Sequence, residues 1–312
     1  IKSNDVDRVI EAAQAVATPP NYEILHVIPR TFTVDNQAGI KDPIGMSGIR
    51  LEADTQIIQG LSAHLKNTQK AIYRTGVNID DLVVSVLASS LACVSKRQKE
   101  LGVAVLNIGA STTSLMVFEE GEVLHTKILP VGGGHVTNDI AIGLRVSTDL
   151  AEKVKIEFGT ATPGDINKRD EINLADIGGE AVNVSRRHIA EIIEARMEEI
   201  FSMVDRELQQ IDRAGLLPAG IVLTGGGAKL PGLIEVGKKQ FRLPAAIGFP
   251  IAVGGTIGYL YTGWNASGLP AWSLGYVYPP ALAGITIASV ATAPLGARLA
   301  HRVPGKMLKR LF

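Results

Sequence analysis

Two glycine-containing turns carry the residue types in this sequence that are best suited to holding a phosphate group. The first, Leu106 to Thr113, reads LNIGASTT, and the second, Thr224 to Gly232, reads TGGGAKLPG. Because glycine has no Cβ, backbone N–H groups in such turns can approach phosphate oxygens closely. Either turn alone is more often structural than functional. The candidate ligand-binding residues in the two turns are Asn107, Gly109, Ser111, Thr112, Gly225, Gly226 and Gly227.

Other catalytic or metal-binding patterns are sparse. The six histidines are dispersed, with no HExxH or paired spacing, so we expect no metal site. Ser111 and Ser114 have no Ser–His–acid signature nearby, so we expect no catalytic nucleophile. Cys93 is the only cysteine, which excludes an internal disulfide and indicates a reducing cytoplasmic location.

The elements that must position the two turns can be predicted from the spacing of apolar residues. Continuous apolar runs predict buried strands, and a long stretch with one apolar and one charged face predicts a surface helix over an α/β sheet. The predicted strands are Leu82 to Leu87, Val103 to Ile108 and Ile221 to Thr224, with a hairpin through Glu119 to Gly121 and a helix from Ser185 to Ile211.

The first 80 residues predict a separate, smaller α+β unit. Asn4 is typical of a helix N-cap, and Gly76 suits the end of a helix. Between these positions we expect a strand from Tyr22 to Ile28, a loop to about Gly48, a strand from Ile49 to Ile57 and a helix from Leu61 to Arg74.

Charge divides the chain at about residue 243. The first 242 residues hold all 31 acidic residues, carry a formal charge of −5 and offer no basic stripe, so no nucleic-acid partner is expected. Residues 243–297 contain no Asp, Glu, Lys or Arg. Their two apolar stretches, Ala245 to Thr262 and Tyr276 to Ala297, predict two transmembrane helices with cations on both cytoplasmic flanks. A buried soluble core is the alternative interpretation.

Several strings in the first 243 residues resemble the bacterial cell-division protein FtsA. They include GMSGIRLEA, HVTNDIAIGL, AEKVKIEFG and GIVLTGGGAKLPGL. The resemblance implies a partial actin-like ATPase fold of the α/β class, with an inserted SHS2-type domain over residues 1–80 and an actin-like domain over residues 81–243. It also implies ATP and Mg²⁺ as cofactors, self-association, and a scaffold that holds FtsZ to the cytoplasmic face of the inner membrane at the septum and recruits other division proteins.

The resemblance also assigns individual residues and exposes departures from the family pattern. Glu152 and Lys155 match the family's adenosine-side pair, with an exposed ion pair as the alternative. Arg196 is expected near an FtsZ-binding surface at the start of the long helix, with a solvated arginine as the alternative. Asn107 stands where the family usually has Asp, Ala110 and Ser111 replace glycines, and the family's phosphate-1 loop would precede Ile1. We therefore expect impaired nucleotide binding and doubtful hydrolysis.

The end of the chain resembles a different family. The sequence segments SLGYVY and APLGARLAHRVP, within residues 245–312, are similar to TauE/SafE-type membrane exporters. The resemblance implies a membrane-spanning segment over residues 244–312 and gives an alternative function, a fragment of an anion exporter. We therefore expect an FtsA-like part joined to an exporter-like part near Leu243.

Overall fold

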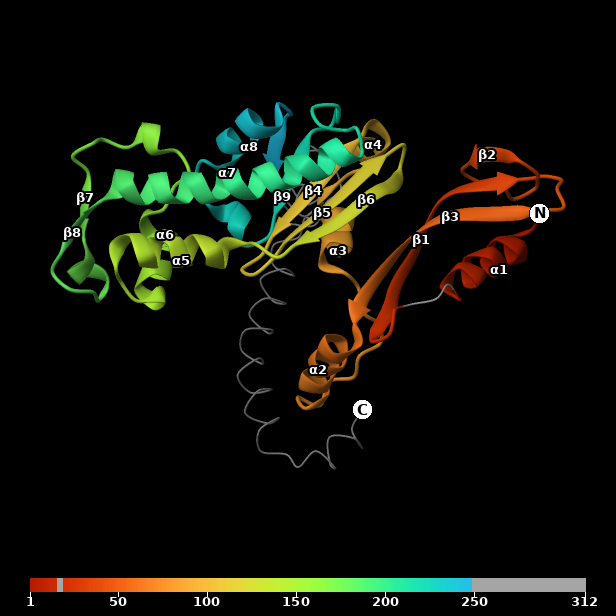
Figure 1. Ribbon diagram of the computed structural model, residues 1–312, viewed down its shortest axis with the longest axis horizontal. Coiled ribbons are helices and arrows are strands. Elements are labelled where there is room, and N and C mark those ends of the chain that lie inside the picture. The colour runs from red at the N-terminus through yellow and green to blue at the C-terminus, as the bar shows by residue number, and fades with distance from the viewer. Residues whose placement is uncertain (16–18, 249–312) are drawn as a thin grey trace, which may run out of the picture. The chain divides into compact units, whose positions relative to one another are not determined.

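The computed structural model describes residues 1–15 and 19–248 (Figure 1). Among these residues, those up to His64 and those from Leu82 to Gly248 belong to one compact unit, which contains a three-stranded and a five-stranded sheet. Most of the two predicted transmembrane stretches lies in residues 249–312, outside the described residues.

The N-terminal part is a three-stranded antiparallel sheet with one helix packed against it. Its strands are β1 (Tyr22–Val34), β2 (Gln37–Ile40) and β3 (Leu51–Leu61), in the order β2-β1-β3. The helix α1 (Ser3–Gln14) contacts β1 and β3. The predicted second helix is present as α2 (Ser62–Tyr73).

The loop predicted after Ile28 is wrong, because β1 continues to Val34 and turns directly into β2. Asp35 and Asn36 form the turn with φ angles of 47° and 83°, a left-handed conformation that Asp and Asn adopt more readily than most residues. The sequence signal was this Asp-Asn pair between two β-prone segments.

The second sheet has five strands in the order β10-β9-β4-β5-β6. Three of its strands run in parallel, since β9 pairs with both β4 and β10, and β5 and β6 are antiparallel neighbours. The strands are β4 (Val103–Ile108), β5 (Thr113–Glu119), β6 (Glu122–Leu129), β9 (Ile221–Thr224) and β10 (Ala245–Ile247). The predicted strands at residues 103–108 and 221–224 and the predicted hairpin are confirmed.

The edge strand β10 corrects the predicted start of the first transmembrane helix. Ala245 to Ile247 pair in register with Ile221 to Leu223 of β9, and the Ile221 N–H also donates to Pro244 O at 2.7 Å. Backbone groups committed to a sheet ladder cannot belong to a membrane-spanning helix. At the start of this stretch, the absence of charged residues therefore belongs to a strand of the sheet and not to a membrane helix.

Alternating residues of the central strands face two different cores, as the two-residue period of a strand requires. Ala104, Leu106 and Ile108 of β4 are fully buried in the core beneath α7. Val103 and Val105 are fully buried in the opposite core, beside Val86 of α3. Both faces of the sheet are therefore covered, which explains why β4 is apolar throughout.

Helices cover the two faces unequally (Figure 1). One face packs against α7 (Arg186–Gln210) and α8 (Leu233–Phe241), and α7 in turn packs against α5 (Gly133–Leu144). The opposite face packs against α3 (Ser85–Cys93). The other elements are α4 (Lys96–Leu101), α6 (Thr148–Phe158), the strands β7 (Glu171–Asn173) and β8 (Asn183–Ser185), and the 3₁₀ helices η1 (Pro163–Asp165), η2 (Leu174–Ile177) and η3 (Gly227–Lys229).

The predicted strand from Leu82 to Leu87 is wrong, because α3 begins at Ser85. A short apolar run has no period long enough to separate a buried strand from a buried helix. Here Val86 and Ser90 of α3 are buried against the sheet, so tertiary packing selects the helix. The predicted long helix is confirmed as α7, with Ser185 as its N-cap accepting from the His188 N–H.

Candidate functional site

A cavity of about 460 Å³ opens where the parallel strands β4 and β9 end. Clefts beyond the carboxyl ends of parallel strands are common ligand sites in α/β folds, and this volume lies within the ~300–1,000 Å³ of typical small-molecule pockets. The cavity is lined by Ile108, Gly109, Ala110, Gly133, Val136, Glu152, Lys155, Ile156, Met197, Gly226, Gly227, Lys229, Leu230 and Pro231. Its wall is thus mostly apolar, with a few charged groups and glycine backbone.

The turn after β9 is packed directly on the end of β4. A Cβ atom on Gly225 would lie 2.6 Å from the Ile108 carbonyl oxygen, and one on Gly227 would lie 2.4 Å from Ile108 Cγ2. A Cβ atom on Gly226, in contrast, would meet nothing within 4 Å. Two of these glycines are therefore required by packing, and Gly226 leaves room at the cavity wall.

The turn after β4 is fixed by backbone hydrogen bonds. Gly109 N–H donates to Thr112 O at 2.9 Å and closes the turn. Gly133 N–H and Gly134 N–H, at the N-terminus of α5, donate to Gly109 O at 2.8 Å and Ala110 O at 2.7 Å. The start of α5 therefore holds the first turn in place, and these two N–H groups are committed to the protein.

Asn107, in β4, lies beside the start of the second turn and does not line the cavity. Its Nδ2 donates to Ser89 Oγ of α3 at 3.3 Å, and its Oδ1 lies 2.4 Å from the point where a Cβ of Gly225 would be. An amide supplies the donor for the Ser89 hydroxyl without placing a negative charge beside the turn.

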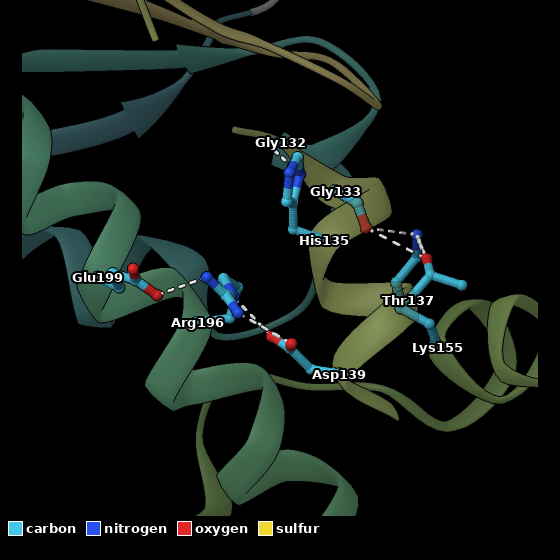
Figure 2. A network of polar contacts seen from close by, with 8 residues as sticks. All are labelled: Gly132, Gly133, His135, Thr137, Asp139, Lys155, Arg196 and Glu199. Carbon is cyan, nitrogen blue, oxygen red and sulfur yellow. Dashed lines mark hydrogen bonds and ion pairs between the residues drawn. The ribbon is translucent and has the colours of Figure 1, made fainter. Parts of the chain in front are cut away.

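Glu152 and Lys155, one turn apart on α6, form a compact hydrogen-bonded cluster at the cavity. Lys155 Nζ donates to Glu152 Oε2 at 2.6 Å, Thr137 Oγ1 at 2.8 Å and Gly133 O at 3.1 Å. Figure 2 shows Lys155 reaching across to Thr137 and Gly133 of α5. Thr137 Oγ1 also bonds to Glu152 Oε2.

This cluster favours the charged form of the Glu152 carboxyl. Partial burial alone would raise the pKa of Glu152, but hydrogen bonds from Lys155 and Thr137 and the positive charge of Lys155 outweigh burial and lower it. Glu152 is therefore held as a carboxylate at neutral pH. The Lys155 side chain is 16% exposed and the Glu152 side chain 44% exposed, so the carboxylate is the more accessible partner.

The structure brings together part of the predicted ligand-binding set. The cavity lining includes Gly109, Glu152, Lys155, Gly226 and Gly227. Asn107, Ser111, Thr112 and Gly225 are not part of the lining, although all belong to the two turns.

Sequence reasoning missed the contribution of α5. Gly133 and Val136 line the cavity, and Thr137 binds both members of the α6 pair. A signal was present in the run Gly132-Gly133-Gly134, a third group of glycines directly before this helix. A Cβ on Gly132 would lie 2.5 Å from Gly109 O, which explains the requirement for glycine at that position.

Arg196 lies near the middle of α7, and its place near an FtsZ-binding surface stays a prediction. Its Nε and Nη2 donate to the two oxygens of Asp139 at 2.5 and 2.9 Å, and its Nη1 donates to Glu199 at 2.6 Å (Figure 2). The hydrogen bond to Asp139 is the main cause that raises the pKa of Arg196. Arg196 is therefore paired with two carboxylates, while its side chain stays 25% exposed to solvent.

No metal centre is apparent among residues 1–15 and 19–248, where no three His, Cys, Asp or Glu side chains gather in a ligand-like group. Glu152 is the only carboxylate that lines the cavity in the described part of the chain. A phosphate-bound Mg²⁺ usually takes one or two protein carboxylates besides water and phosphate oxygens. The first turn, with Asn107, supplies none.

A mixed sheet with helices on both faces, and a glycine-walled cavity at the ends of its parallel strands, place the chain in the α/β class and agree with an actin-like ATPase fold. The family model described as "Cell division protein FtsA" matches residues 104–263, and the model "SHS2 domain inserted in FTSA" matches residues 1–59. The chain belongs to the FtsA family of cell-division proteins.

Individual relatives agree with this assignment. The chain is 38% identical to FtsA of Pseudomonas aeruginosa over 252 residues, which cover 80% of this chain and 60% of that protein. It is 34% identical to FtsA of Escherichia coli strain K12 over 267 residues, 83% of this chain and 64% of that protein. The chain thus spans about 60% of the length of these relatives.

A solved structure supports the fold independently. The "PilM-PilN type IV pilus biogenesis complex" superposes with a TM-score of 0.55 at 18% identity, covering 78% of this chain and 62% of the matched chain. Identity this low supports similarity of fold alone.

FtsA similarity continues past the expected junction near Leu243, because the family model reaches residue 263. That segment includes β10 and the whole of the first predicted transmembrane stretch, Ala245 to Thr262. No comparison supports the exporter resemblance of residues 245–312. Within the part of the chain that the structure describes, none of the helices combines the length and the apolar character needed to cross a bilayer.

Proposed function

We propose that this protein works as a cell-division scaffold of the FtsA kind and that the cavity is one half of an adenine-nucleotide site. Membership of the FtsA family supports the scaffold. The observation that carries the nucleotide site is the cavity of about 460 Å³, which places the two glycine turns and the Glu152–Lys155 pair around one space.

The residues present fit a nucleotide. Ile108, Ile156 and Met197 give the cavity apolar walls against which a flat base can pack. Glu152 supplies a carboxylate that accepts hydrogen bonds from sugar hydroxyls or a base amine. Gly226 lines the cavity with open space where a Cβ would be, so phosphate oxygens can approach its backbone. Bound ATP would stabilise the nucleotide-bound form of the protein relative to the nucleotide-free form. We propose no hydrolysis.

Magnesium should contribute little to binding by this part of the site. A neutral side chain at Asn107 gives no charge to attract Mg²⁺, and its amide is already bonded to Ser89. Isothermal titration of the 312-residue chain with ATP, with and without Mg²⁺, tests this. We expect binding that changes less than about threefold with Mg²⁺, since no protein carboxylate of the first turn holds the metal. Lack of any ATP binding would reject the nucleotide site, and strong Mg²⁺ dependence would reject the account of Asn107.

For partners, we propose FtsZ and other division proteins, a second copy of the chain, and the cytoplasmic membrane face at the septum. Arg196 remains the candidate contact for an acidic FtsZ C-terminal segment. It can serve in two ways, either by direct contact through its partly exposed guanidinium or by fixing α5 against α7 through Asp139.

Two substitutions separate these possibilities. Arg196→Lys keeps the positive charge but loses the two parallel hydrogen bonds to the Asp139 carboxylate. Asp139→Asn keeps the Arg196 guanidinium but removes the negative charge that is paired with it. Fluorescence anisotropy with an FtsZ C-terminal peptide measures both. If Arg196 contacts the peptide directly, the Asp139→Asn protein should bind the peptide more strongly, because Asp139 no longer neutralises the Arg196 guanidinium. If both substitutions leave the affinity unchanged, Arg196 does not belong to the binding surface.

A further inference from the structure

The α6 pair at the cavity is completed by a third residue on another helix. Thr137 of α5 is 6% exposed, and its hydroxyl contacts Glu152, Lys155 and Gly133 at once. A hydroxyl has one proton and two lone pairs. Lys155 donates to a lone pair, so the single proton is donated to either Glu152 Oε2 or Gly133 O, and the closer contact is with Glu152.

The donors of Lys155 are fully used within this cluster. An ammonium group has three N–H bonds, and the three acceptors of Lys155 are Glu152, Thr137 and Gly133. No donor of Lys155 is left for a ligand in this arrangement. In contrast, all the hydrogen bonds recorded for Glu152 involve Oε2, so within the described residues Oε1 is the oxygen that remains for a ligand.

We propose that Thr137 and Lys155 are positioning residues of the nucleotide site, which hold Glu152 Oε2 so that Oε1 is the Glu152 oxygen that contacts the bound nucleoside. The proposal rests on the nucleotide site proposed above and divides the labour within it. The same hydrogen bonds connect α6 to the first turn through Gly133. Lys155 donates to Gly133 O, and Gly133 N–H donates to Gly109 O of that turn.

Thr137→Val tests this, because valine has nearly the shape of threonine and lacks the hydroxyl. We expect ATP affinity in the 312-residue chain to fall about tenfold, the usual scale for losing a hydrogen bond to a charged group. Thr137→Ser restores the hydroxyl and should recover most of the affinity. Ser90→Ala removes another buried hydroxyl, bonded to Leu87 O of α3 on the opposite face of the sheet, and should leave ATP affinity unchanged.

A second readout does not need a nucleotide. The Thr137 hydrogen bond helps to lower the pKa of Glu152, so Thr137→Val should raise that pKa and Ser90→Ala should not. Carbon-13 NMR titration of the Glu152 carboxyl measures the shift.

The outcomes are distinguishable. If the wild-type protein binds no ATP, the nucleotide site is rejected. If, in addition, the pKa of Glu152 is unchanged in Thr137→Val, the positioning role of Thr137 is rejected as well. Wild-type affinity in Thr137→Val, or a Thr137→Ser protein as weak as Thr137→Val, overturns the proposal even where the wild type binds ATP.

Discussion

The two turns at the cavity both contain glycine and both follow a buried strand, but they are held in place by different forces. The turn after β4 is fixed by hydrogen bonds from the start of α5 to Gly109 O and Ala110 O. The turn after β9 is fixed by close packing on Ile108, with no space for a Cβ on Gly225 or Gly227. A glycine in a phosphate-binding motif can therefore be required for contact with its own protein, for contact with a ligand, or for neither.

The largest effect should come from Gly225→Ala. Gly225 has a φ angle of 88°, and the new Cβ would lie 2.6 Å from the Ile108 carbonyl oxygen. Backbone strain and overpacking together should cost about 3 kcal/mol of unfolding free energy. Urea denaturation measures this loss, with Gly226→Ala as the neighbouring control. Equal stability of the two variants would refute packing as the force that holds the second turn.

Gly132→Ala should have a smaller effect on the first turn. The φ angle at Gly132 is −165°, which any residue adopts, so steric contact alone opposes the substitution: the new Cβ would lie 2.5 Å from Gly109 O and 2.8 Å from Ala110 O. We expect a loss of about 2 kcal/mol, because α5 must move away from the turn. Hydrogen exchange should show faster opening at the Gly133 and Gly134 amides. Unchanged protection of those amides would contradict the role assigned to α5.

Ala110→Gly probes the position where the family has glycine. Ala110 keeps a negative φ angle in this turn, so glycine gains nothing in the folded state and makes the unfolded chain more flexible. We expect stability to fall by about 0.7 kcal/mol, within the usual range for this exchange. An increase in stability measured by thermal unfolding would mean that alanine is strained at this position.

Gly226→Ala should affect stability least and binding most clearly. Its φ angle is −62° and no atom lies within 4 Å of the new Cβ, so stability should change by at most about 0.5 kcal/mol, in the favourable direction. Because Gly226 lines the cavity, the added methyl group should weaken ATP binding. Unimpaired ATP binding by this variant would place the phosphates away from the second turn.

Local sequence patterns determined much of the fold. The strands at residues 103–108 and 221–224, the Glu120-Gly121 hairpin turn and the helix α7 were predicted from periodicity and turn residues. The hairpin turn depends on local backbone conformation, with φ angles of 53° and 92° at Glu120 and Gly121, and the strands and α7 show their burial directly in the spacing of apolar residues. Resemblance to FtsA, carried by short strings, determined the family.

The sequence did not determine the secondary structure of two short apolar runs. Residues 82–87 predicted a strand but lead into α3, and residues 245–247 predicted the start of a membrane helix but form β10. The first segment places Val86 of α3 against the sheet, and the second pairs with β9 as an edge strand of the same sheet. Whether a short apolar segment is helix or strand depends on the partner that it packs against, and that partner is distant in sequence.

The arrangement of the site was likewise decided by tertiary structure. The sequence alone indicated Gly109, Gly226, Glu152 and Lys155 as candidates, but Thr137 carries no motif, and Arg196 gives no sign that Asp139, 57 residues earlier in the chain, neutralises it. A hydrogen bond between helices requires side chains to meet within about 3 Å, and residue spacing along the chain does not set that distance. The sequence thus determined which groups are present, and the packing of α5 against α6 and α7 determined which of them are committed to the protein and which face the cavity.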